Sequence, residues 1–84
     1  EYTYQVSAVC FSPDGQMFAL GKIDGSVEVW RKEKDDFKFS FNLEKHNNVV
    51  SAVCFSPDGK FLATGSADKT VKIWQIDNNL NNTS

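Results

Sequence analysis

The ten residues VSAVCFSPDG occur twice in this chain, at Val6–Gly15 and again at Val50–Gly59. The offset between the two copies is 44 residues, from position 6 to position 50. The same offset pairs five further residues: Ala19 with Ala63, Gly21 with Gly65, Asp24 with Asp68, Val27 with Val71 and Trp30 with Trp74. Because identities this dense at one offset exclude coincidence, the chain consists of two copies of one structural unit.

Each unit alternates short apolar stretches with signals for tight turns. In Ser-Pro-Asp-Gly the proline presets φ, the aspartate tolerates the third turn position and the glycine accepts a positive φ at the exit. Second and third strands are expected after this turn, at 17–20 and 27–30 and again at 61–64 and 71–74. The first strand, which precedes the turn, is expected to be buried through Val6, Val9 and Phe11 in one copy and Val50, Val53 and Phe55 in the other.

A fourth strand is expected in the first unit only. Its apolar residues alternate with Lys38, Ser40 and Asn42, and they are Phe37, Phe39, Phe41 and Leu43. This alternation predicts a half-buried strand with one apolar face. The aromatic residues could form a ligand-binding stripe, but on an outer strand we expect them to pack between neighbouring units.

One unit is therefore a four-stranded antiparallel meander, and no segment has helical periodicity. A period of 44 residues with four strands is typical of a β-propeller blade. The sequence predicts an all-β chain that forms an incomplete propeller. Residues 1–44 form the first blade, 45–77 form a second blade of three strands that lacks its outer strand, and 78–84 form an Asn-rich tail or linker.

Composition narrows the function classes. The chain has 84 residues, of which 40% are hydrophobic and 24% charged, so it is a folding sequence. The net charge is −2 and the basic residues are scattered, whereas nucleic-acid binding requires a basic face. No run of about 18 apolar residues exists to span a membrane. We therefore expect neither nucleic acid nor membrane as a partner.

The two cysteines, Cys10 and Cys54, occupy equivalent positions in the repeat. Equivalent side chains point in the same direction, so a bridge between them is not expected. We interpret them as small buried hydrophobes of a reducing compartment, the cytoplasm or the nucleus. No metal site or other cofactor site is expected, because Cys-x-x-Cys is absent and His46 has no companion histidine.

These motifs resemble the WD-repeat family. The resemblance is carried by His46, by VSAVCFSPDG at Val50–Gly59 and by LATGSADKTVKIW at Leu62–Trp74, with their counterparts in the first unit. The family's Gly-His pair is Lys45–His46 here, and its Trp-Asp pair is Trp30–Arg31 in one copy and Trp74–Gln75 in the other. Neither departure alters the strand pattern.

The resemblance implies a buried hydrogen-bond chain in the second unit, formed by Trp74, Thr64, His46 and Asp68. A histidine, a hydroxyl and a carboxylate also suggest a hydrolase triad. We expect a structural role and no catalytic residue, because no nucleophile elbow or anion cradle accompanies them. In the first unit Tyr2 and Leu20 replace the histidine and the hydroxyl, so that blade is expected to rely on apolar packing.

For the whole chain the resemblance implies a non-catalytic scaffold that binds other proteins or peptides, not an enzyme. Residues beside the inner-strand entries and the turn aspartates would contact a partner or else pad the space between blades: Tyr4, Ile23, Asn48 and Ala67. Two apolar blade faces and open sheet edges need cover. Further blades would supply it in cis, if this is a segment of a larger propeller as the missing initiator methionine suggests, or in trans, if copies close a ring as a structural subunit.

Overall fold

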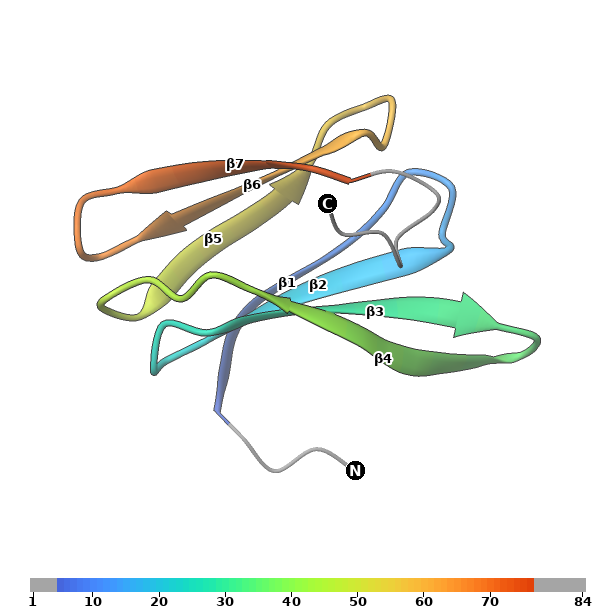
Figure 1. Ribbon diagram of the computed structural model, residues 1–84, viewed down its shortest axis with the longest axis horizontal. Helices are drawn as coiled ribbons and strands as arrows, with labels where there is room; N and C mark the ends of the chain where they lie inside the picture. Colours follow the sequence, from blue (N-terminus) through green and yellow to red (C-terminus); the bar gives the residue numbers. More distant parts are fainter. Residues whose placement is uncertain (1–4, 77–84) are drawn as a thin grey trace.

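The structure, a computed structural model, describes residues 5–76, which form seven strands in two antiparallel sheets (Figure 1). The first sheet has the order β1-β2-β3-β4 and contains β1 (Val6–Phe11), β2 (Met17–Lys22), β3 (Val27–Glu33) and β4 (Asp36–Leu43). The second has the order β5-β6-β7 and contains β5 (Val50–Phe55), β6 (Phe61–Ser66) and β7 (Val71–Gln75). This confirms an all-β chain of two meanders, the second without a fourth strand among the described residues.

Tyr4 and the predicted tail at 78–84 lie outside the described residues. Within the part that the structure describes, no helix is long and apolar enough to cross a membrane.

The predicted turn forms in both copies. Gly15 donates its N–H to the carbonyl of Ser12 at 2.9 Å and has a φ of 75°. The Asp14 carboxylate accepts hydrogen bonds from the Ser12 hydroxyl at 2.7 Å and from the Gln16 N–H at 3.0 Å. The second copy repeats these bonds through Ser56, Asp58 and Gly59. The turn chemistry therefore sets the register of the first hairpin in each blade.

The two sheets lie face to face, with β5 packed over β1 and β2 (Figure 1). Because side chains alternate along a strand, each sheet has two faces. We call one the alanine face, after Ala19 and its equivalent Ala63, and the other the tryptophan face, after Trp30 and Trp74. The core forms where the alanine face of the first sheet meets the tryptophan face of the second, through Met17, Ala19 and Val29 on one side and Phe55, Leu62 and Ile76 on the other.

Burial of the first strand depends on this stacking. Val50 and Phe55 on β5 are buried, as expected, but the equivalent β1 residues are not: Val6 is 41% and Phe11 57% exposed. The expectation for Val6, Val9 and Phe11 is wrong because they lie on the tryptophan face of the first sheet, which no other sheet covers within residues 5–76. Val53 is half-buried.

The apolar stripe of β4 is divided by a β-bulge. Val29 pairs with Phe41, but the next residue, Trp30, pairs with Phe39, so Ser40 is the extra residue on β4. A bulge of one residue transfers the rest of the strand to the other face. Phe41 and Leu43 pack against the core, whereas Phe37 and Phe39 lie on the tryptophan face; the single apolar face expected for this strand is wrong.

The two cysteines correct another expectation. Both are free, Cys10 is half-buried and Cys54 is exposed. Cys10 pairs with Ala19 on the covered alanine face, whereas Cys54 pairs with Ala63 on the alanine face of the second sheet, which lacks cover. The same residue type is therefore a core side chain in one blade and a surface thiol in the other.

Candidate functional site

His46 lies in the segment between β4 and β5 and is only 2% exposed. Its Nε2 atom is 2.8 Å from the hydroxyl of Thr64, a fully buried residue of β6. The Trp74 indole on β7 donates to that same hydroxyl at 3.4 Å. Buried polar groups require such partners, and these contacts connect the inner and outer parts of the second blade through one imidazole.

On the other side of the ring, His46 Nδ1 is 3.1 Å from the Thr70 hydroxyl and 3.6 Å from Asp68 Oδ2. The Thr70 hydroxyl donates to the Asp68 carboxylate. One proton arrangement serves every contact: Trp74 donates to Thr64, Thr64 donates to Nε2, and Nδ1–H points toward Thr70 and Asp68. The structure therefore brings together all four expected residues and adds Thr70.

Asp68 is held in its ionised form. Hydrogen bonds from the Thr70 hydroxyl and the Asn47 N–H lower the pKa of Asp68 to about 2. The Asn47 bond is 2.8 Å long and joins the β6–β7 turn to the segment that precedes β5. A carboxylate that accepts several hydrogen bonds loses them on protonation, which is the physical cause of the shift.

The two buried members of this set, His46 and Thr64, are closed to a substrate, whereas Asp68 and Thr70 lie nearer the surface. The hydroxyl of Thr64 is buried and already engaged by two rings, and His46 is covered. A nucleophile and its base must reach a reacting atom about 3 Å away. What the arrangement does chemically is hold strands together.

The first blade has a different polar set, which the sequence interpretation missed. Trp30 Nε1 donates to Glu28 Oε1 at 3.1 Å, and Glu28 Oε2 pairs with Lys22 Nζ at 2.6 Å. Leu20 indeed offers no hydroxyl, but the expectation that this blade relies on apolar packing alone is wrong. The strand register explains why these polar side chains meet. Leu20 pairs with Glu28, so positions 20, 22, 28 and 30 lie on the same side of the sheet, the tryptophan face.

Three of the four predicted partner-binding residues lie at one end of the sheets, and Tyr4 is outside the described residues. Ile23 is 51% exposed in the β2–β3 turn, and Asn48 and Ala67 are exposed. The Ser66 hydroxyl, beside Ala67, donates to the Asn48 carbonyl at 3.2 Å. The His46 N–H donates to the Gly25 carbonyl at 2.9 Å, and this bond joins the segment between β4 and β5 to the β2–β3 turn. We call this end, with Ile23, Asn48 and Ala67, the turn face.

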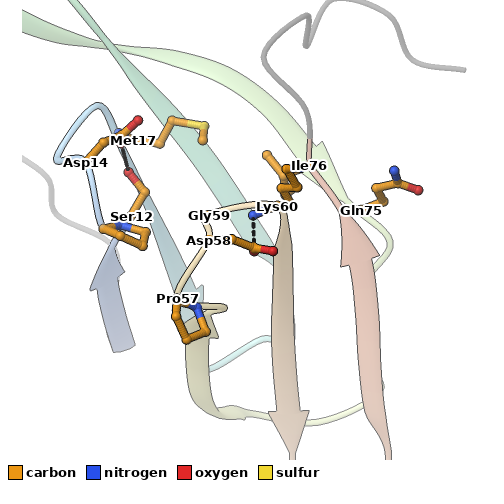
Figure 2. A pocket seen from close by; sticks show the side chains of 10 residues that line it. Ser12, Asp14, Met17, Pro57, Asp58, Gly59, Lys60, Gln75 and Ile76 are labelled. Atoms are coloured by element: carbon orange, nitrogen blue, oxygen red, sulfur yellow. Dashed lines mark hydrogen bonds between the residues drawn. The ribbon is translucent and has the colours of Figure 1, made fainter.

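At the opposite end, a cavity of about 580 Å³ opens between the two Ser-Pro-Asp-Gly turns (Figure 2). Met17 and Ile76 line it beside Asp14, Asp58 and Lys60. The carboxylates already serve their own turns, and hydrogen bonds from Gln16 and Ser12 lower the pKa of Asp14 as those from Ser56 and Lys60 lower the pKa of Asp58. No group of three or more potential metal ligands occurs within residues 5–76.

Comparison with known proteins gives consistent matches. The family model described as "WD domain, G-beta repeat" matches residues 1–31 and 37–75. Meiotic fizzy-related protein 2 of Schizosaccharomyces pombe is 44% identical over 41 residues, which is 44% of this chain and 8% of that protein.

Two crystal structures share the fold. The β-propeller domain of Myceliophteria thermophila Cps50 (Swd1) has a TM-score of 0.78 at 23% identity, covering 89% of this chain and 22% of that chain. The computationally designed Ika4 protein has a TM-score of 0.71 at 26% identity, covering 86% of this chain and 41% of that chain. The chain thus spans less than half the length of each of these proteins.

Proposed function

Because the chain belongs to the WD-repeat family, we propose that it is a non-catalytic platform for binding other proteins or peptides, and that the turn face is its contact surface. The propeller fold is typical of such scaffolds, since its blades hold turns rigidly in one plane. Fold alone does not assign a partner, so the proposal rests on the surface itself.

The observation that supports this surface is the exposure of Ile23 on a rigid turn. A β-branched apolar side chain, half in solvent, lies where the backbone is held by hydrogen bonds from Lys22 N–H to the Ser26 carbonyl and from Gly25 N–H to the Lys22 carbonyl, both 3.0 Å. Asp24 accepts further bonds from Ser26. An apolar anchor on a backbone that is already ordered costs less conformational entropy on binding, which favours an interface hot spot.

The surroundings of Ile23 suit a partner with an apolar anchor and a polar rim. The carbonyl oxygens of His46 and Asn48 lie next to Gly25, two residues after Ile23 in the same turn, and offer hydrogen-bond acceptors near it. Asp68 is ionised there, and hydrogen bonds from Ser26 lower the pKa of Asp24, so both turns present carboxylates at neutral pH. We therefore expect peptides with an apolar residue next to basic or amide side chains.

Selection of peptides from a random displayed library against the immobilised chain tests the proposal. The recovered peptides are then measured against Ile23→Ala and against Ile73→Ala, which shortens a somewhat more exposed isoleucine (62% against 51%) on the alanine face of the second sheet. We expect at least a tenfold loss of affinity for Ile23→Ala only. Peptides that bind Ile23→Ala as tightly as the unaltered chain would remove the turn face from consideration.

A second candidate, a structural subunit that closes a propeller with copies of itself, is favoured by the uncovered faces of the two sheets. It does not compete with partner binding, because the turn face lies at the end of the blades and the uncovered faces lie on their flanks.

A further inference from the structure

Two apolar surfaces of the described chain have no other sheet packed on them within residues 5–76, although Leu20 and Lys22 on the first of them are buried. One is the tryptophan face of the first sheet, where Phe11, Phe18, Trp30, Phe37 and Phe39 form a connected aromatic cluster with ring centroids 5.1 to 5.9 Å apart. The other is the alanine face of the second sheet, where Phe61, Val71 and Ile73 are exposed, Ile73 by 62%. Patches of this kind on a soluble domain are association surfaces.

We propose that a second copy of this chain covers them, with the alanine face of β5–β7 of one copy packed on the tryptophan face of β1–β4 of the next. The chain already contains one interface of this type, because its own first sheet offers an alanine face to the tryptophan face of its second sheet. The uncovered surfaces are the repeat equivalents of the two halves of that interface. Stacking of copies continues the internal interface from blade to blade.

The closest contact of the internal interface, between Gly21 and Val50, has an equivalent on the two uncovered faces, in Gly65 and Val6. A Cβ at Gly21 would lie 2.3 Å from Val50 Cγ1, so glycine is required where β5 crosses β2. At the equivalent Gly65 a Cβ would meet nothing within 4 Å. The equivalent of Val50 is Val6, which is 41% exposed. In the stack, Val6 of one copy packs against Gly65 of its neighbour.

The serine that follows each of these valines, Ser7 on β1 and Ser51 on β5, gives a second pair of equivalent contacts. The Ser7 hydroxyl lies 3.1 Å from the Gly21 carbonyl and 2.6 Å from the Val50 carbonyl, and thus bridges the two sheets. Its equivalent, Ser51, lies 3.3 Å from the Gly65 carbonyl, which reproduces the bond within the blade. The neighbouring copy supplies the second acceptor, the Val6 carbonyl.

In the copied interface the core side chains change: Phe61 and Ile73 take the places of Met17 and Val29, and Phe18 and Lys32 take the places of Leu62 and Ile76. The turn between β6 and β7 differs as well. A Cβ at Gly25 would lie 2.2 Å from the His46 carbonyl oxygen, whereas the equivalent residue is Lys69, which carries a Cβ at a φ of 77°. The contact between copies is therefore looser at this turn than the contact within a chain. Lys69→Gly removes the obstacle and is expected to tighten assembly.

A contact between two different faces is head-to-tail, and it closes into a ring when the rotation per blade allows. Three or four copies give about six to eight blades, within the usual range for propellers. This inference rests on the second candidate function, the structural subunit, and not on peptide binding at the turn face, so loss of peptide binding and loss of assembly are independent results.

Light scattering and sedimentation of the purified chain over a range of concentrations test the proposal. We expect a mass of three or four chains, reduced to one chain by Gly65→Ala and by Ile73→Asp and unchanged by Ile23→Ala. Gly65→Ala is the more telling variant, because the added methyl group has free space in the isolated chain.

Mixing two monomeric variants tests the direction of the contact. Val6→Asp disables the tryptophan face and Ile73→Asp disables the alanine face, so a mixture retains one intact interface and is expected to form a dimer of one chain of each. A monomeric unaltered chain, assembly that both Gly65→Ala and Ile73→Asp leave unchanged, or a mixture that stays monomeric would overturn the proposal.

Discussion

Gly21 on β2 and Val50 on β5 are in such close contact that the two sheets can approach only because residue 21 has no side chain. A Cβ at position 21 would lie 2.6 Å from the Val50 Cβ and closer still to Cγ1. Val50 is fully buried and its branched side chain has few rotamers, so it cannot move aside. The lack of a side chain at Gly21 therefore determines how closely the two blades approach each other.

Substitution of that glycine should loosen the internal interface. Gly21→Ala is expected to lower the free energy of unfolding by about 1–3 kcal/mol, because overpacking must separate the sheets. Urea unfolding followed by tryptophan fluorescence measures it, with Gly65→Ala as the matched control. The loss for Gly21→Ala should persist at every chain concentration, whereas any loss for Gly65→Ala should depend on concentration. Equal, concentration-independent losses would contradict the close contact.

The Thr64 hydroxyl is the centre of the polar chain in the second blade. Thr64→Val keeps the shape of the side chain but removes the partner shared by His46 and Trp74, so we expect a loss of about 1–3 kcal/mol in unfolding free energy. Thr64→Ser retains the hydroxyl and should lose much less. Chemical denaturation of both variants gives the comparison, and similar losses for the two would show that the methyl group, not the hydroxyl, matters.

The ion pair between Lys22 and Glu28 should show strong coupling. Their side chains are only 10% and 13% exposed. Glu28→Ala removes the acceptor of Trp30 together with the counter-charge of Lys22, and roughly 3–5 kcal/mol is typical for loss of one buried partner. The double variant Lys22→Met, Glu28→Leu should recover most of the loss. A double-mutant cycle measures the coupling, and additive losses would contradict it.

The strand order and the turns could be predicted because they depend on local patterns, and Ser-Pro-Asp-Gly specifies a turn wherever it stands. The residues of the polar chain were implied by the resemblance to the WD-repeat family, since the first unit has Tyr2 and Leu20 where the second has His46 and Thr64. Thr70 was missed because a hydroxyl two residues after a turn aspartate is an ordinary turn feature. Only the fold shows that this hydroxyl also faces the His46 ring.

Features that depend on a neighbour could not be predicted. Cys10 and Cys54 have identical local sequences, yet their exposure differs because only one of them faces another sheet. The bulge at Ser40 was equally hidden, since Phe37 to Leu43 alternate without interruption and pairing with β3, not the pattern, determines the shift. The Lys22–Glu28 pair could have been predicted from the sequence, because the alternation of side chains places both residues on the same face of neighbouring strands.

Acid should weaken the second blade through Asp68. Its pKa is lowered from 3.8 to about 2 in the folded chain, first by the Thr70 hydroxyl and then by the Asn47 N–H. A carboxylate with a lowered pKa stabilises the fold fully above its unfolded value, and that contribution is lost as the pH falls from about 4 toward 2.

Thr70→Val isolates this effect. Removal of the main hydrogen bond should raise the pKa of Asp68 toward its ordinary value and flatten the dependence of stability on pH in that window. Carboxyl carbon chemical shifts titrated by NMR follow Asp68 separately from Asp14, Asp24 and Asp58, whose pKa values are also lowered by their own turns. A titration midpoint near 3.8 for Asp68 in the unaltered chain, or the same midpoint in both proteins, would show that Thr70 does not hold the charge.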